Sequence, residues 1–145
     1  MKEDKETCIF CRILKGELES SMVYEDELCV AFMDIQPVNP GHVLVIPKEH
    51  VSYIGELNEE LGAHIFRVGM RINKALRKTD VRCEGIDYFL ADGEAAGQEV
   101  FHTHLHVFPR YTNDGFGFRF GPDYHYMSPR EVLDATAVKI KAALK

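Results

Sequence analysis

The stretch that decides the fold is Val100-Phe101-His102-Thr103-His104-Leu105-His106-Val107-Phe108. It is rich in β-branched and aromatic residues and follows a glycine-containing turn, which predicts a β-strand over residues 100–108 with a histidine at every second position from 102 to 106. Successive side chains of a strand point to opposite sides, so the three histidines share one face and Leu105 and Val107 turn to the other. Three imidazoles on one sheet face would make an unusual core, so the pattern indicates a functional strand.

The segments before this strand predict a helix and a partner strand. A strand is expected at residues 86–91, followed by the Gly-Ala-rich turn 92–97. Over residues 58–79, apolar side chains recur at intervals of three and four with charged residues between them. This spacing predicts an amphipathic helix that lies on the sheet.

Three short β-branched or aromatic runs, 22–25, 28–33 and 42–47, predict an antiparallel meander. Glu-Asp-Glu at 25–27 and the proline-containing run 37–41 supply the turns between them. Thr7 is a candidate cap for a short helix over residues 8–14, which places Cys8 and Cys11 one turn apart.

The part of the chain after residue 110 reads differently. Residues 111–126 contain three glycines and six aromatic side chains without helical or strand periodicity, so an ordered loop is expected. Ser-Pro-Arg-Glu at 128–131 matches a capping box that starts a final helix. We therefore predict a single α+β domain over residues 1–145, with a sheet of about five strands, three helices and a polar tail at 1–7.

Composition limits the function. The formal net charge of −6 argues against a protein that coats a nucleic-acid polymer, because such binding needs clustered Lys and Arg. The start of the chain is charged, and no segment has the roughly 18 apolar residues that cross a membrane. We expect a cytoplasmic protein, in which paired cysteines more often hold metal than form disulfides.

The segment from Gly97 to Val107 resembles the signature of the histidine triad (HIT) family of hydrolases and nucleotidyltransferases, and especially its zinc-containing bacterial members. Phe32 to Pro37 and Pro40 to His50 also resemble that family at matching order and spacing. The similarity covers about residues 8–110 and implies a HIT-like fold and usually a homodimer. It implies that His104 is the nucleophile and that His106 binds and polarises the phosphate. A neutral imidazole is nucleophilic at pH 7 when its other nitrogen carries the proton.

The resemblance also implies a nucleotide site. Asp34 would accept hydrogen bonds from the ribose hydroxyls, since one carboxylate can accept from both. The remaining nucleotide-binding candidates are apolar side chains at the base, residues near the phosphate and the two catalytic histidines: Ile9, Phe10, Ile13, Phe32, Ile35, Gly97, Gln98, Glu99, Val100, His104 and His106. The N–H groups of the glycine-containing turn are suited to approach a phosphate.

Cys8-x-x-Cys11 is half of a tetrahedral zinc site, and the family pattern supplies His50 and His102 as the other ligands. Four protein ligands make such a zinc structural, pinning the first helix to the histidine strand. A metal-free reduced pair and a redox motif are the alternatives, although no thioredoxin-like βαβ context is present. His42, His64 and His125 are interpreted as packing or surface residues.

The resemblance predicts a hydrolase of purine nucleoside phosphoramidates, adenylated conjugates or dinucleoside polyphosphates that works through a nucleotidyl-histidine. A nucleotide-binding or interaction protein with little catalysis is the alternative. The chain departs from the family pattern at Ala91, where many relatives have asparagine, and at Glu99, where some have serine.

Overall fold

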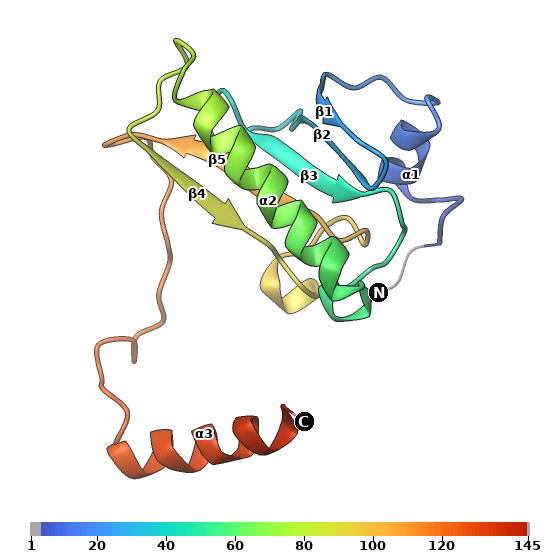
Figure 1. Ribbon diagram of the computed structural model, residues 1–145. Helices are drawn as coiled ribbons and strands as arrows, with labels where there is room; N and C mark the ends of the chain where they lie inside the picture. Colours follow the sequence, from blue (N-terminus) through green and yellow to red (C-terminus); the bar gives the residue numbers. More distant parts are fainter. Residues whose placement is uncertain (1–3, 145) are drawn as a thin grey trace. The chain divides into compact units, whose positions relative to one another are not determined.

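The computed structural model describes residues 4–144. Within that range, five strands form one antiparallel sheet in the order β1-β2-β3-β5-β4 (Figure 1). They are β1 (Met22–Glu25), β2 (Cys29–Met33), β3 (Val43–Pro47), β4 (Gly85–Phe89) and β5 (Leu105–Arg110). With the helices described below, this sheet confirms the predicted α+β fold.

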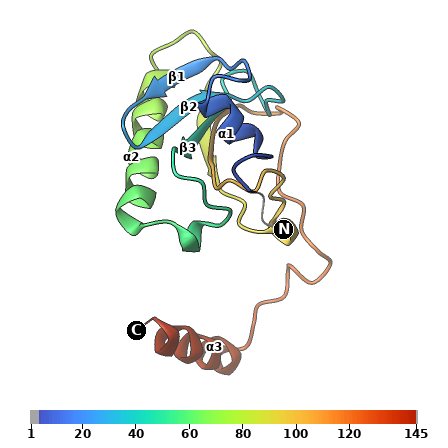
Figure 2. The same cartoon turned by 90° about the vertical axis from the view of Figure 1, so that its right-hand side faces the viewer.

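The sheet lies between two helices (Figure 2). Helix α2 (Glu59–Leu76) begins at the cap Asn58, whose side chain accepts from two backbone N–H groups, and covers one face. Helix α1 (Ile9–Leu14) covers the other face. Alternation along the strands builds both cores: Ala31, Val45 and Val107 belong to the cluster that includes α2, and Val30, Phe32, Leu44 and Ile46 to the cluster that includes α1.

The predicted strand over residues 100–108 is wrong at its start, because β5 begins at Leu105. The ladder with β3 ends at the pair Val45 and Leu105. Before that pair the backbone turns away, and the Thr103 N–H donates to the carbonyl of Val51 at 2.8 Å, outside β3. Of the three predicted strand histidines, His106 alone projects from β5, whereas His102 and His104 project from the segment that leads into it.

Of the described residues, 115–144 form a compact unit distinct from the unit of residues 4–114. This second unit contains α3 (Arg130–Ala143), whose N-cap is Pro129 without a side-chain cap, so the predicted capping box at Ser128 is wrong. The expectation of one domain over the whole chain stays a prediction. Among the described residues, no helix has both the length and the apolar character needed to cross a bilayer.

Asp26 joins the β1–β2 turn to helix α2. Its Oδ1 accepts from the backbone N–H groups of Leu28 and Cys29, and its Oδ2 accepts from His64 at 2.6 Å and from the Tyr24 hydroxyl at 2.8 Å. Burial opposes ionisation of Asp26, but the hydrogen bonds from His64, the two amides and Tyr24 hold its pKa well below 3.8.

We therefore expect Asp26→Ala to lower the free energy of unfolding by about 1–2 kcal/mol at pH 7. Because the folded pKa is depressed, this stabilisation is present above the unfolded pKa of 3.8 and is lost as the pH falls through the folded value. Urea unfolding of both proteins across this range measures the difference. Asp26→Asn, which keeps an acceptor for the two amides, should lose less; an equal loss would contradict the role of the charge.

Candidate functional site

The imidazole of His104 is held in one tautomer by the backbone. Its Nδ1–H donates to the carbonyl oxygen of His102 at 2.7 Å, which leaves the lone pair of Nε2 available. The ring is buried and lies edge-on to Phe10, with 5.0 Å between the ring centroids. Burial lowers the pKa of His104, against the opposing effects of the His102 carbonyl, Asp34 and Glu99, so the ring is neutral at pH 7.

The tautomer of His106 is set through a fourth histidine, His42. The backbone N–H of Val38 donates to His42 Nδ1 at 3.0 Å, so the neutral ring carries its proton on Nε2. That nitrogen lies 2.9 Å from His106 Nδ1 and donates to it, which leaves the His106 proton on Nε2. Burial and the neighbouring imidazoles of His104 and His42 lower the pKa of His106 to about 4. A neutral N–H donor thus stands beside the His104 ring, with 4.8 Å between the ring centroids.

The interpretation of His42 as a packing or surface residue misses its role in the site. The residue is 2% exposed, and its ring sits within the histidine cluster and orders His106. Its position beside the β3 segment gives no signal of this contact, because 64 residues separate the two histidines along the chain. The antiparallel pairing of β3 with β5 brings them together.

Asp34 lies beside these histidines. Its Oδ1 accepts from the Gln36 N–H at 2.8 Å, and its Oδ2 lies 3.5 Å from His42 Nε2 and 4.0 Å from His106 Nδ1. Phe10 and Phe32 form an edge contact near the same site, with ring centroids 5.5 Å apart. The structure therefore brings a carboxylate, two aromatic rings and two imidazoles into one region.

The other residues predicted to contact the nucleotide differ in their burial. Ile13 and Val100 pack against the cluster around Phe10, whereas Ile35 is 93% exposed and Ile9 is 45% exposed. Glu99 is exposed, and its charge acts on His104. The predicted nucleotide contacts thus include both core residues and exposed residues.

The turn around Gly97 differs from the expected open phosphate cradle. The N–H groups of Ala96 and Gln98 donate to the Gly93 carbonyl, and the N–H of Gly97 donates to the Glu94 carbonyl. The side chain of Gln98 is buried: it accepts from the Gly93 N–H and donates to the carbonyls of Ser52 and Val100. The N–H groups of Ala96, Gly97 and Gln98 therefore form hydrogen bonds within the turn.

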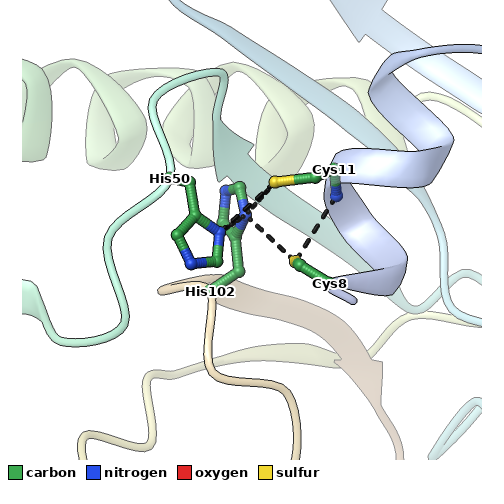
Figure 3. A group of neighbouring side chains, drawn as sticks. All are labelled: Cys8, Cys11, His50 and His102. Carbon is green, nitrogen blue, oxygen red and sulfur yellow. Dashed lines mark hydrogen bonds between the residues drawn. The ribbon is translucent and has the colours of Figure 1, made fainter. Parts of the chain in front are cut away.

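Cys8, Cys11, His50 and His102 converge on one point between α1 and the segment before β5 (Figure 3). The two thiols lie 3.5 and 3.6 Å from His102 Nδ1, Cys11 Sγ lies 3.3 Å from His50 Nδ1, and the two imidazole nitrogens are 3.2 Å apart. Around a tetrahedral zinc ion, two nitrogen ligands lie about 3.3 Å apart, a nitrogen and a sulfur about 3.6 Å, and two sulfurs about 3.8 Å. The nitrogen–nitrogen and nitrogen–sulfur distances of the four residues are close to these values. Cys8, rather than the expected Thr7, is the N-cap of α1.

Two other groups of side chains could also offer metal ligands, Asp26–Cys29–His64 and Asp34–His42–His106. Their hydrogen bonds differ from those of the cluster at Cys8. The Nε2–H of His102 donates to the Pro47 carbonyl at 2.8 Å, which frees Nδ1 for a metal. In each of the other groups, Nδ1 of His64 or His42 already accepts a hydrogen bond, so Nε2 carries the proton. Of these three groups, the cluster at Cys8 is the one suited to a metal ion.

The redox alternative for Cys8 and Cys11 is poorly supported. Burial and the neighbouring Cys8 raise the pKa of the Cys11 thiol to about 11. A reactive thiol needs a lowered pKa, and a metal ion deprotonates a coordinating thiol. The donor set therefore fits zinc better than thiol-disulfide exchange.

Comparisons with known proteins identify the family of the chain. The HIT domain family matches residues 15–113. An uncharacterised HIT-like protein of Borreliella burgdorferi is 48% identical over 79% of this chain and 83% of its own length. The adenosine 5'-monophosphoramidase hnt1 of Schizosaccharomyces pombe is 36% identical over 87% and 90%. A crystal structure of a zinc-bound histidine triad protein from Mycobacterium smegmatis has a TM-score of 0.75 at 36% identity, covering 97% of this chain and 99% of that one. The chain belongs to the HIT family.

Proposed function

We propose that this protein hydrolyses nucleotide conjugates through a covalent nucleotidyl intermediate on His104. The observation that carries the proposal is the hydrogen bond from His104 Nδ1–H to the His102 carbonyl, which leaves Nε2 as an unprotonated nucleophile. His106 is proposed as the second catalytic residue, because its Nε2–H is a neutral donor for a phosphate oxygen.

The chemistry proceeds in two displacements. His104 Nε2 forms a bond to the α-phosphorus, the bond from phosphorus to the leaving group breaks, and the leaving group takes up a proton from solvent. The nucleotidyl-imidazolium retains its Nδ1–H, and the His102 carbonyl stabilises its positive charge. Water then attacks phosphorus, and the P–N bond to His104 breaks. The products are a nucleoside monophosphate, a proton and free neutral His104.

The proposed substrates are purine nucleoside phosphoramidates, adenylated conjugates or dinucleoside polyphosphates. Similarity to the hnt1 phosphoramidase supports the first of these. The base would lie against the aromatic rings of Phe10 and Phe32, and Asp34 would accept from the ribose. The further contacts proposed for the nucleotide are those predicted from the sequence: Ile9, Ile13, Ile35, Gly97, Gln98, Glu99 and Val100.

A substrate panel tests the proposal. Release of AMP from an adenosine phosphoramidate and from diadenosine triphosphate should be followed by chromatography with the purified full chain. We expect turnover of at least one of them. Binding of AMP without turnover of any conjugate would instead favour a nucleotide-binding protein on the same scaffold.

The pH profile gives a second test. Since His104 must be neutral to attack and burial lowers its pKa, the acid limb of kcat/KM should have its midpoint below 6.5. Three groups oppose this effect of burial by raising the pKa of His104: the His102 carbonyl, Asp34 and Glu99. Activity should therefore persist at a pH where an exposed histidine is half protonated. An acid limb above 6.5 would contradict the assignment of a buried nucleophile.

The proposed cofactor is one structural zinc ion held by Cys8, Cys11, His50 and His102. It would supply no open coordination position, so its role is to tie α1 to the segment carrying His104. A cytoplasmic location and a homodimer are also proposed. The support for the dimer is that β4 lies at a sheet edge, where its strand can pair with a second copy. Sedimentation across micromolar concentrations tests the dimer.

A further inference from the structure

Phe10 connects the metal cluster to the nucleotide site. It lies on α1 between Cys8 and Cys11, and all three side chains are buried. Its ring makes edge contacts with His104 at 5.0 Å and with Phe32 at 5.5 Å between centroids. A metal ion that fixes the two cysteines therefore also fixes the ring that borders the nucleophile.

His102 makes a second connection within a single residue. Its Nδ1 lies among the metal ligands, its Nε2–H donates to the Pro47 carbonyl, and its own carbonyl accepts from His104 Nδ1. Displacement of this imidazole would move the carbonyl that selects the His104 tautomer. His102 is thus a positioning residue that acts on the nucleophile through its backbone.

We infer that the metal site and the nucleotide site are thermodynamically coupled through Phe10 and His102, so that an ion in the Cys2His2 cluster raises the affinity for AMP. Helix α1 has six residues, too few to hold its shape alone, and depends on these anchors. The inference rests on the proposed function only in taking AMP as the ligand.

Coupling of this kind is reciprocal: if the ion raises AMP affinity by some factor, AMP raises the affinity for the ion by the same factor. A factor of about 10 is expected, within the usual range for coupled sites. A zinc ion that only stabilises the fold would leave both affinities unchanged in a protein that remains folded, so that both factors would be about 1.

The test uses the full chain loaded with Co²⁺, whose visible spectrum reports thiolate ligation. AMP affinity is measured by calorimetry with and without the ion, and Co²⁺ affinity with and without AMP, under conditions where circular dichroism shows folded protein. The expected result is two equal factors of about 10. Equal AMP affinity in the two states, or equal Co²⁺ affinity with and without AMP, overturns the coupling.

A change in the connecting ring provides a test without removing the ion. At AMP concentrations that saturate each protein, AMP should shift the Co²⁺ spectrum of the wild-type protein, and Phe10→Leu should retain thiolate ligation but lose most of that shift. Arg12→Ala, an exposed change on the same helix, is the matched control and should keep it. A shift of wild-type size in Phe10→Leu overturns the role of the ring.

The outcomes also separate this inference from the proposed function. Coupled affinities in a protein that turns over no conjugate would leave the coupling intact and remove the hydrolase. Turnover with uncoupled affinities would do the reverse. In addition, ¹⁵N spectra should show the Nδ1–H tautomer of His104 in the loaded protein and its partial loss after removal of the ion; an unchanged tautomer in folded metal-free protein contradicts the role of His102.

Discussion

His104→Ala is expected to lower kcat/KM for any substrate of this protein by at least about 10⁴-fold, or about 5 kcal/mol of transition-state stabilisation. The imidazole forms the bond to phosphorus in the proposed reaction, and an alanine side chain at this position has no group that replaces it. The neighbouring His106 cannot act instead, because its Nδ1 accepts from His42 and its Nε2 carries the proton. Steady-state release of AMP measures the loss.

Two controls make this result specific. His125→Ala removes an exposed histidine and should keep full turnover. The His104→Ala protein itself should keep its circular dichroism spectrum and measurable AMP affinity, since Phe10, Phe32 and Asp34 remain. Turnover within about 10-fold of wild type in a folded His104→Ala protein would exclude His104 as the nucleophile.

Removal of the metal is expected to have the largest effect on stability. Structural zinc contributes about 10–16 kcal/mol of apparent binding free energy in small zinc-finger peptides. Here α1 also has the apolar anchor Phe10, so a smaller loss of about 3–5 kcal/mol is expected on chelation or in Cys11→Ala. For a chain of this size, the thermal midpoint should fall by about 10 °C or more.

Calorimetric melting with and without a chelator, together with metal analysis, measures this effect. Cys83→Ser is the matched control, because Cys83 lies outside the cluster, where its thiol donates to the Gly85 carbonyl. That variant should retain its ion and its sensitivity to chelation. Identical melting of loaded and chelated wild-type protein would show that the four residues hold no structural metal.

Most of the fold was predictable because periodicity reports burial directly. The apolar spacing of α2 marks the face that packs on the sheet, and the short apolar runs of β2 and β3 match strands that are buried on both faces. The start of β5 was not predictable in this way. The strand-like composition and the spacing of the histidines continue before Leu105, but the Thr103 N–H donates to the Val51 carbonyl, a contact between distant segments.

The candidate site, too, was predicted only in part from the sequence. The meeting of Cys8, Cys11, His50 and His102 was predicted from Cys8-x-x-Cys11 and the family pattern, and their ligand atoms do lie together. The zinc ion itself stays a prediction. The role of His42 was missed, because it arises from the pairing of β3 with β5 and from the Val38 N–H that sets its tautomer. The turn at Gly97 was expected to expose its N–H groups, whereas three successive groups are used within the turn.

In the proposed reaction, His104 Nε2 becomes covalently bonded to the substrate phosphorus. Wild-type protein is mixed with an adenosine phosphoramidate and quenched rapidly without acid, and the covalent adduct is then measured by intact-mass analysis and peptide mapping. We expect a transient mass increase of one adenylyl group on His104, absent from His104→Ala. Single-turnover release of AMP without any adduct, or an adduct on another residue, would contradict it.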